Sequence, residues 1–335
     1  MFLIFVTMKI FFSLFFIFFF LSCNDSNDDK MELEIFRFEY SLFNSTENNI
    51  NSQKIIWNQE LGSFSNYYDQ IILGLSSTND SSYHTSLLSF INHPDMKEVY
   101  DSIAKSFVDF TIHKQDLNEA LDAYEDLLPY VLVPKFITMF SGFNYGVIAY
   151  DSVLAIGLDF YLGEKSVFYE RLRNPEYLKF QKQKKFMLAN VFEALCNRDW
   201  EEYHRGNDFL SSIIYKGKVM YFLNKILPSR TESNILRFSE DQYQWCEDNE
   251  FLIWSYFIEN ELLFSTKESR YMSYLNYSPF AKGMPKESPG RIAYYIGGNI
   301  IDNYMSQNKN ISFEDLMKQT DYRLILKESK YKPKR

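Results

Sequence analysis

The sequence is poor in the residues that make tight turns. Its 335 residues include 12 glycines and 9 prolines. Sandwiches, barrels and propellers made of many short strands need a turn every few residues, so this composition disfavours them. Hydrophobic residues make up 46% of the chain and aromatic residues 18%, which is ample for a large core. We therefore predict a globular protein that is mainly helical.

Histidine and cysteine are also scarce, with four and three residues respectively. No two histidines are four residues apart and none is followed by glutamate, so the H-E-x-x-H helix of zinc proteases is absent. The chain also lacks the G-x-S-x-G nucleophile elbow, the Walker phosphate loop and the G-x-G-x-x-G fingerprint. We expect no catalytic residue of a standard class, no bound metal and no cofactor.

The chain has no excess of positive charge. Lysine and arginine total 35 and aspartate and glutamate 44, which gives a formal net charge of −9. Nucleic acids and anionic lipid surfaces are bound by cationic faces, so we expect no nucleic-acid partner.

The N-terminus has the pattern of a lipoprotein signal. Residues 1–22 contain one charge, Lys9, before a 12-residue apolar run that ends at Leu21. That run suits a signal peptide and is short for a membrane-spanning helix. Translation starts at Met1 or at Met8, and the second choice gives the usual order of Met-Lys, apolar core and cleavage site.

Phe20-Leu21-Ser22-Cys23 resembles the lipobox of bacterial lipoproteins, in which the cysteine is acylated, as with palmitate, and becomes the new N-terminus. Residues 23–30 then form the lipidated cysteine and a polar, acidic tether. We expect a single globular domain over 31–335, anchored to a membrane by its lipid on the periplasmic side of the cell envelope.

Sheet signals are few. The alternation over 32–40 slips by one at Phe36 and predicts a first strand with a bulge or an end there. Val147–Tyr150 and Val153–Ile156 predict a hairpin around Asp151-Ser152. Polar stretches at 44–54 and 76–86 predict loops.

Apolar spacing of three and four predicts the following helices: 95–107, 116–128, 177–196, 208–227, 240–264, 289–307 and 313–319. The predicted class is α+β, mainly α, with a small antiparallel or mixed sheet and a helical C-terminal half.

Cys196 and Cys246 remain once Cys23 carries the lipid. A disulfide is allowed outside the cytoplasm. Both residues lie in predicted amphipathic helices, so two buried free thiols are an equal alternative.

One carboxylate lies on an apolar helix stripe. Glu250 follows Cys246 and precedes Trp254 at spacings of four, so it faces the same side. Its expected partner is Arg291 in Glu287-Ser288-Pro289-Gly290-Arg291, where Pro289 would occupy a first helical turn. Glu250 and Arg291, with Glu287 and Trp254 nearby, form either a structural ion pair between two helices or the wall of a pocket. Gly297-Gly298 in the second helix marks the close approach of another backbone.

Several longer segments resemble one known family, the gliding motility-associated lipoprotein GldB of Bacteroidetes. The resemblance spans nearly the whole chain and rests on the lipobox together with the following segments: 35–39, 141–146, 157–163, 216–222, 245–254, 287–291 and 329–335.

The resemblance implies a cell-envelope lipoprotein required for gliding motility, with partners in the motility and type IX secretion machinery. It also implies a degenerate zincin-like metallopeptidase fold, in which the hairpin near 144–158 supplies the edge strand beside an active helix near 177–196. That helix contains no histidine here. The zinc ligands and catalytic base of the peptidases have no counterpart.

Two functions therefore remain open. The first is a non-catalytic binding or scaffold protein of the motility apparatus. The alternative is an envelope hydrolase that uses carboxylates such as Glu193, Glu250 or Glu261 without the zinc motif.

Overall fold

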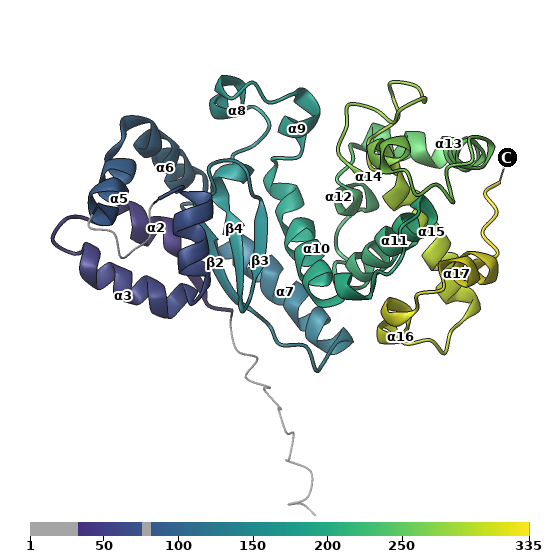
Figure 1. Cartoon of the computed structure of the whole chain (residues 1–335), viewed down its shortest axis with the longest axis horizontal. Coiled ribbons are helices and arrows are strands. Elements are labelled where there is room, and N and C mark those ends of the chain that lie inside the picture. Colours follow the sequence, from purple (N-terminus) through teal and green to yellow (C-terminus); the bar gives the residue numbers. More distant parts are fainter. Residues whose placement is uncertain (1–32, 76–81, 335) are drawn as a thin grey trace, which may run out of the picture. The chain divides into compact units, whose positions relative to one another are not determined.

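The strands come from two distant parts of the chain. The computed structural model describes residues 33–75 and 82–334. β1 (Ile35–Arg37) lies beside β2 (Lys135–Met139), β4 (Val153–Gly157) follows and β3 (Val147–Tyr150) forms the edge (Figure 1). β1, β2 and β4 are mutually parallel, whereas β3 is antiparallel to β4. The predicted mixed sheet and hairpin are confirmed.

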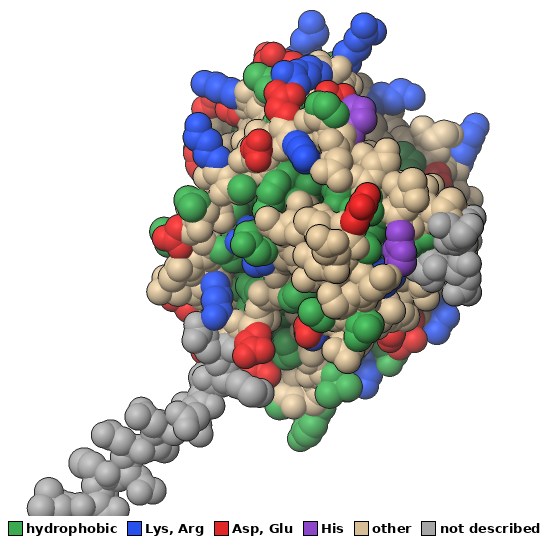
Figure 2. Space-filling view, turned by 90° about the vertical axis from the view of Figure 1, so that its left-hand side faces the viewer, with side chains coloured by type: hydrophobic (Ala, Val, Ile, Leu, Met, Phe, Trp, Pro, Cys, Tyr) green, Lys and Arg blue, Asp and Glu red, His purple; other side chains and the backbone are tan. Residues whose placement is uncertain are grey.

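The sheet separates two hydrophobic cores. Phe136 and its neighbour Leu154 point into one core, whereas Ile137 and Ala155 point into the other. Successive side chains of a strand alternate between the two faces, so each face must be covered. The smaller core lies beneath four helices: α2 (Phe38–Phe43), α3 (Ile50–Leu61), α4 (Phe64–Tyr67) and α5 (Tyr83–Asn92). Acidic and basic side chains are scattered among neutral ones on this side of the molecule (Figure 2).

The larger core joins the other face of the sheet to the helical C-terminal half. Its longer helices are α6 (Pro94–Ser106), α7 (Thr111–Leu127), α10 (Met187–Trp200), α11 (Phe209–Ile226), α13 (Glu240–Glu259) and α15 (Ile292–Gln307). Shorter helices connect or cover them: α8 (Val167–Arg171), α9 (Glu176–Phe180), α12 (Glu232–Leu236), α14 (Met272–Leu275), α16 (Phe313–Lys318) and α17 (Tyr322–Ser329). The fold class is α+β and mainly α, as predicted.

The first strand ends at Arg37, one residue after the expected bulge or end at Phe36. The chain there turns into α2, where Phe38 and Leu42 lie one helical turn apart and both enter the smaller core. The two expected N-terminal loops need correction. Part of 44–54 is helical, since α3 begins at Ile50 and buries Trp57. α5 begins within the second expected loop, at Tyr83.

In the C-terminal half, the helix expected over 177–196 is two helices, α9 and α10. The helix expected from 289 begins only at Ile292. Arg291 precedes it in the left-handed conformation with φ 59°, so Pro289 lies in a turn outside the helix. The described residues belong to one compact unit that begins at Leu33. The expected signal peptide, lipidated Cys23 and tether lie outside the described residues.

The glycine in α15 does mark a close helix contact. A Cβ built on Gly297 would lie 2.2 Å from the carbonyl oxygen of Ile213, and one on Gly217 would lie 2.1 Å from that of Gly297. Real Cβ atoms do not approach backbone so closely, so α11 and α15 need glycine on both sides of their contact.

We expect Gly217→Ala to reduce the free energy of unfolding by about 1–3 kcal/mol, because the added methyl group forces two helix backbones apart. Gly298→Ala is the matched control. Its Cβ would meet only Met220, at 3.6 Å, and alanine favours a helix by about 1 kcal/mol over glycine. Urea denaturation measures both variants. Equal stability of the two would contradict the close contact.

Candidate functional site

A single carboxylate organises the most polar cluster at the α10–α15 side of the larger core. Glu193 of α10 accepts hydrogen bonds from Arg237 Nη2 at 2.5 Å and Arg291 Nη2 at 3.2 Å on its Oε2 atom. Its Oε1 atom accepts from the Tyr294 hydroxyl at 3.2 Å and from Arg291 Nη2 at 3.3 Å. Both carboxylate oxygens are therefore bonded twice.

The electrostatics of the cluster keep Glu193 ionised. Burial opposes its ionisation, but the charges of Arg237, Arg291 and Lys216 outweigh burial and lower the pKa of Glu193 to about 2. Burial likewise opposes the charge on Lys216, yet the neighbouring Tyr294 and Glu193 raise the pKa of its ammonium. The cluster is a fixed array of charges that does not titrate near neutral pH.

The chain positions both arginines through strained backbone. Arg237 has φ 61° and ends α12, whereas Arg291 has φ 59° and precedes α15. The Arg237 side chain is sealed and donates to the carbonyls of Ala189 and Ile235 and to Asn190 Oδ1. Left-handed backbone is costly outside glycine and is tolerated where surrounding contacts hold it, as they do here.

Arg291 is held by aromatic rings. Its guanidinium carbon lies 3.9 Å from the ring centroid of Tyr294 and 4.6 Å from that of Tyr277. Its Nη1 atom donates to the Tyr277 hydroxyl at 2.5 Å. The guanidinium group therefore lies over the Tyr294 ring while it donates to Glu193.

A cavity of about 570 Å³ opens beside this cluster. It lies between the β3 edge of the sheet, α10 and the start of α15, and its lining residues are Asn144, Tyr145, Gly146, Val147, Phe160, Tyr161, Gln181, Asn190, Glu193, Ala194, Asn197, Leu275, Asn276, Tyr277, Arg291 and Tyr294. We call this cavity the Glu193 cleft. Its volume is within the range of about 300–1,000 Å³ that small-ligand sites occupy.

A second cavity of about 310 Å³ adjoins the Glu193 cleft and shares Gln181 and Tyr277 with it. Gln181 is 9% exposed and donates from Nε2 to the Arg237 carbonyl at 3.2 Å. Its Oε1 atom is buried and has no hydrogen-bond partner in the described part of the protein.

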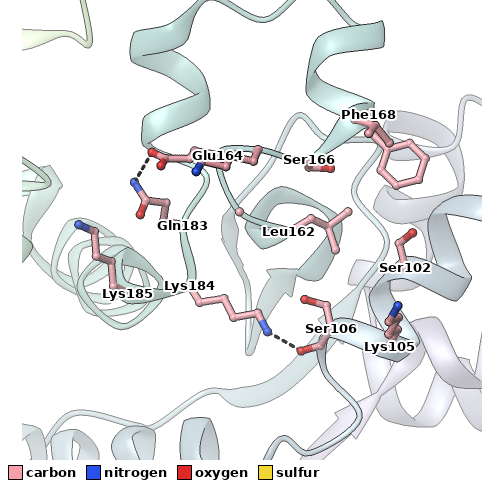
Figure 3. A pocket seen from close by; sticks show the side chains of 13 residues that line it. Ser102, Lys105, Ser106, Leu162, Glu164, Ser166, Phe168, Gln183, Lys184 and Lys185 are labelled. Atoms are coloured by element: carbon pink, nitrogen blue, oxygen red, sulfur yellow. Dashed lines mark hydrogen bonds between the residues drawn. The ribbon is translucent and has the colours of Figure 1, made fainter.

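A third depression, of about 850 Å³, lies between α6 and the segment that precedes α10 (Figure 3). Lys184 reaches across it to donate to the Ser106 carbonyl, and Gln183 donates to Glu164 at 3.1 Å. Lys185 points away from the depression (Figure 3). No buried ion pair lines this depression among the described contacts, whereas Glu193 and Arg291 line the Glu193 cleft, which makes that cleft the stronger candidate.

A family model described as gliding motility protein GldB matches residues 23–333. The chain belongs to the GldB family. No match was found among curated proteins or among solved structures. The match begins at Cys23, the residue that the sequence predicts to be lipidated.

Three of the seven segments that carry the GldB resemblance line the Glu193 cleft. The segment 141–146 supplies Tyr145, 157–163 supplies Tyr161, and 287–291 ends at Arg291. Lys216 begins a fourth segment, 216–222, and acts on Glu193 through its charge without lining the cleft.

The expected ion pair between Glu250 and Arg291 is wrong. Arg291 lies in the cleft but pairs with Glu193. Glu250 accepts on Oε1 from Asn299 Nδ2 at 2.9 Å and from the Tyr331 hydroxyl at 2.7 Å. Helical spacing had identified the face that carries Glu250, but spacing does not determine which neighbouring chain covers that face.

The other two residues predicted with Glu250 do not line the Glu193 cleft. Trp254 packs edge-on against Tyr331, with ring centroids 5.2 Å apart, so it belongs with Glu250 to a contact that holds the C-terminal segment. Glu287 is exposed. Cys196 and Cys246 are both buried free thiols.

Sequence reasoning named Glu193 only as one of three possible carboxylates and missed Arg237 and Gln181. A signal for α10 was present, because Asn190, Glu193 and Asn197 follow one another at spacings of three and four, and the other residues of the helix before Arg198 are apolar. Gln181 and Arg237 lie in or beside short helices without periodicity, so no pattern marked them.

Within residues 33–75 and 82–334, no group of three or more histidine, cysteine, aspartate or glutamate side chains could hold a metal ion. Over the same residues, no helix is long and apolar enough to span a bilayer.

Proposed function

We propose that this GldB-family protein is a lipid-anchored component of the cell envelope that serves gliding motility by binding rather than by catalysis. The family supports the link to gliding motility, and the match from Cys23 onward supports a lipidated start of the mature chain. An acylated Cys23, followed by the polar tether to residue 30, would hold the folded unit beside a membrane on the periplasmic side.

The proposed binding role rests on the hydrogen bonds and the pKa of Glu193. A general base needs a free lone pair and a pKa near the working pH. Glu193 receives four hydrogen bonds, and its pKa is lowered to about 2. A carboxylate held in this way is a poor proton acceptor, but it fixes two arginines and a tyrosine as a rigid wall.

The partners that suit this role are proteins of the motility apparatus and of the type IX secretion machinery linked to it. A tethered protein meets such partners at the membrane surface. The Glu193 cleft then contributes a pre-formed site, because its charged wall needs no rearrangement to receive a ligand.

The anchor is tested by labelling with an alkyne analogue of palmitate in a gliding bacterium that lacks its own copy of the gene. We expect Cys23→Ala to lose the label and gliding on agar, because one lipid-bearing cysteine carries the anchor. Cys196→Ala, which alters a buried thiol, should keep the label. Undiminished gliding by an unlabelled Cys23→Ala protein would refute the need for tethering.

The cleft is tested in the same strain with Ala194→Trp, which places a large ring in the Glu193 cleft. Asn303→Trp adds the same ring at an exposed position of α15 outside the cleft. We expect Ala194→Trp to abolish gliding while its amount in the membrane fraction stays normal, and Asn303→Trp to glide. Equal gliding of the two strains would remove the cleft from the function.

A further inference from the structure

Two kinds of side chain predominate in the lining of the Glu193 cleft. Five are aromatic: Tyr145, Phe160, Tyr161, Tyr277 and Tyr294. Five are amides: Asn144, Gln181, Asn190, Asn197 and Asn276. Glu193 and Arg291 are the charged residues of the lining, and they pair with each other. The surface offered to a ligand is therefore flat rings and neutral polar groups.

This combination matches the chemistry of a sugar. A pyranose presents a flat face of C–H groups, which packs on an aromatic ring, and a rim of hydroxyl groups that both donate and accept. An amide side chain also carries a donor and an acceptor side by side, so it pairs with such hydroxyls whichever way they turn. A carboxylate or phosphate ligand would instead need a free cation.

The cations near the cleft are already engaged. Arg237 has a fully sealed side chain, and Arg291 donates to both Glu193 and Tyr277. Lys216 does not line the cleft. An acidic ligand would therefore have to compete with Glu193 for its partners, whereas a neutral ligand would leave the charged cluster intact.

Hydrogen-bonding capacity remains inside the cleft. Tyr277 is half-buried and accepts from Arg291, which leaves its phenol proton to donate. Asn144 and Asn276 are exposed side chains of the same lining. A ligand with several hydroxyl groups can bond to these amides and receive the Tyr277 phenol proton together.

We propose that the Glu193 cleft binds a neutral oligosaccharide, such as a segment of an envelope or cell-surface glycan. The proposal rests on the binding role proposed above and names its ligand class. The adjoining cavity that shares Gln181 and Tyr277 gives room for the glycan to continue past the first sugar.

The experiment uses the full acylated chain in a detergent without a sugar headgroup, with binding measured by isothermal titration calorimetry. The probes are chitotriose, cellotriose and mannotriose as neutral trisaccharides, trigalacturonate as an acidic one, and trialanine as a peptide. We expect saturable binding of at least one neutral trisaccharide and none of trigalacturonate or trialanine.

Ala194→Trp should weaken that binding more than tenfold, and Asn303→Trp should leave it unchanged. A thermal unfolding midpoint within a few degrees of the parent confirms that each variant is folded.

Failure to bind any of the three neutral trisaccharides would overturn the proposal. Binding of trialanine or trigalacturonate that Ala194→Trp abolishes would overturn it in favour of a peptide or an acidic glycan. If Ala194→Trp stops gliding in cells while no neutral trisaccharide binds, the sugar is wrong and the binding role stands. If the Ala194→Trp strain glides normally, the proposed role of the cleft is wrong.

Discussion

Replacing Glu193 by alanine should reduce the free energy of unfolding by about 3–5 kcal/mol, because it leaves two buried arginines without their counter-charge. Arg237 and Arg291 have side chains that are 0% and 4% exposed, so both charges rely on the carboxylate and not on water. Urea denaturation at neutral pH measures the loss.

Glu98→Ala is the control for a carboxylate that pairs with arginine at the surface. Glu98 and Arg171 form a two-fold hydrogen-bonded pair with side chains that are 47% and 59% exposed. Exposed pairs contribute about 0–1 kcal/mol. Losses of equal size in Glu98→Ala and Glu193→Ala would show that the Glu193 cluster is solvated and not a fixed wall.

The Glu193 cluster also predicts a pH dependence. The pKa of Glu193 is about 2 in the folded protein and 4.5 in its ordinary state. Its ionised form is thus favoured by folding, so its contribution of about 3 kcal/mol is complete above pH 4.5. The contribution is lost as the pH falls from 4.5 through 2. Glu193→Gln should lack this acid-sensitive component, and an unchanged acid profile of Glu193→Gln would contradict the assigned pKa.

Local patterns predicted much of the fold. The hairpin was visible as two short runs around Asp151-Ser152, α6 as apolar spacing of three and four, and the glycine at the α11–α15 contact as a helix-breaking residue inside a helix. The pairing of Ile35 with Phe136 was not visible, because no local pattern connects strands about a hundred residues apart. Packing in the two cores determines that β2 is the strand that pairs with β1.

The candidate site was predictable only in part for the same reason. Arg291 was found from its sequence neighbours, but its partner was assigned to the wrong helix. Arg237 follows a five-residue helix and takes the left-handed conformation, which no propensity favours for arginine. Such a residue is held by its tertiary hydrogen bonds, so its role emerges only when α10 and α12 are brought together.

Asp159→Ala should destabilise the loop that carries Asn144 and Tyr145 into the Glu193 cleft. Asp159 is fully buried and accepts from Ser141 N at 2.8 Å, Ser141 Oγ at 2.9 Å and Phe143 N at 2.5 Å. Each buried donor left without an acceptor costs about 1–3 kcal/mol. We expect a total loss of about 3 kcal/mol at neutral pH, because removing a buried charge offsets part of the cost.

Asp159 should change the pH dependence of stability in the direction opposite to that of Glu193. Burial raises the pKa of Asp159 from 3.8 to about 6, and the hydrogen bonds from Phe143 and Ser141 only partly oppose that rise. The folded protein therefore binds this proton more tightly than the unfolded chain does. Its stability relative to the unfolded chain grows as the pH falls from 6 to 3.8, by about 3 kcal/mol from this group.

Asp159→Asn isolates that effect, because asparagine has the same shape and does not titrate. The stability of the parent minus that of Asp159→Asn, measured by urea denaturation at pH 7, 6, 5 and 4, should increase toward acid. Parallel profiles would mean that Asp159 keeps its charge in the folded state. An increase would show that a buried, proton-binding aspartate holds the 141–146 loop, whereas an ionised glutamate holds the opposite wall of the same cleft.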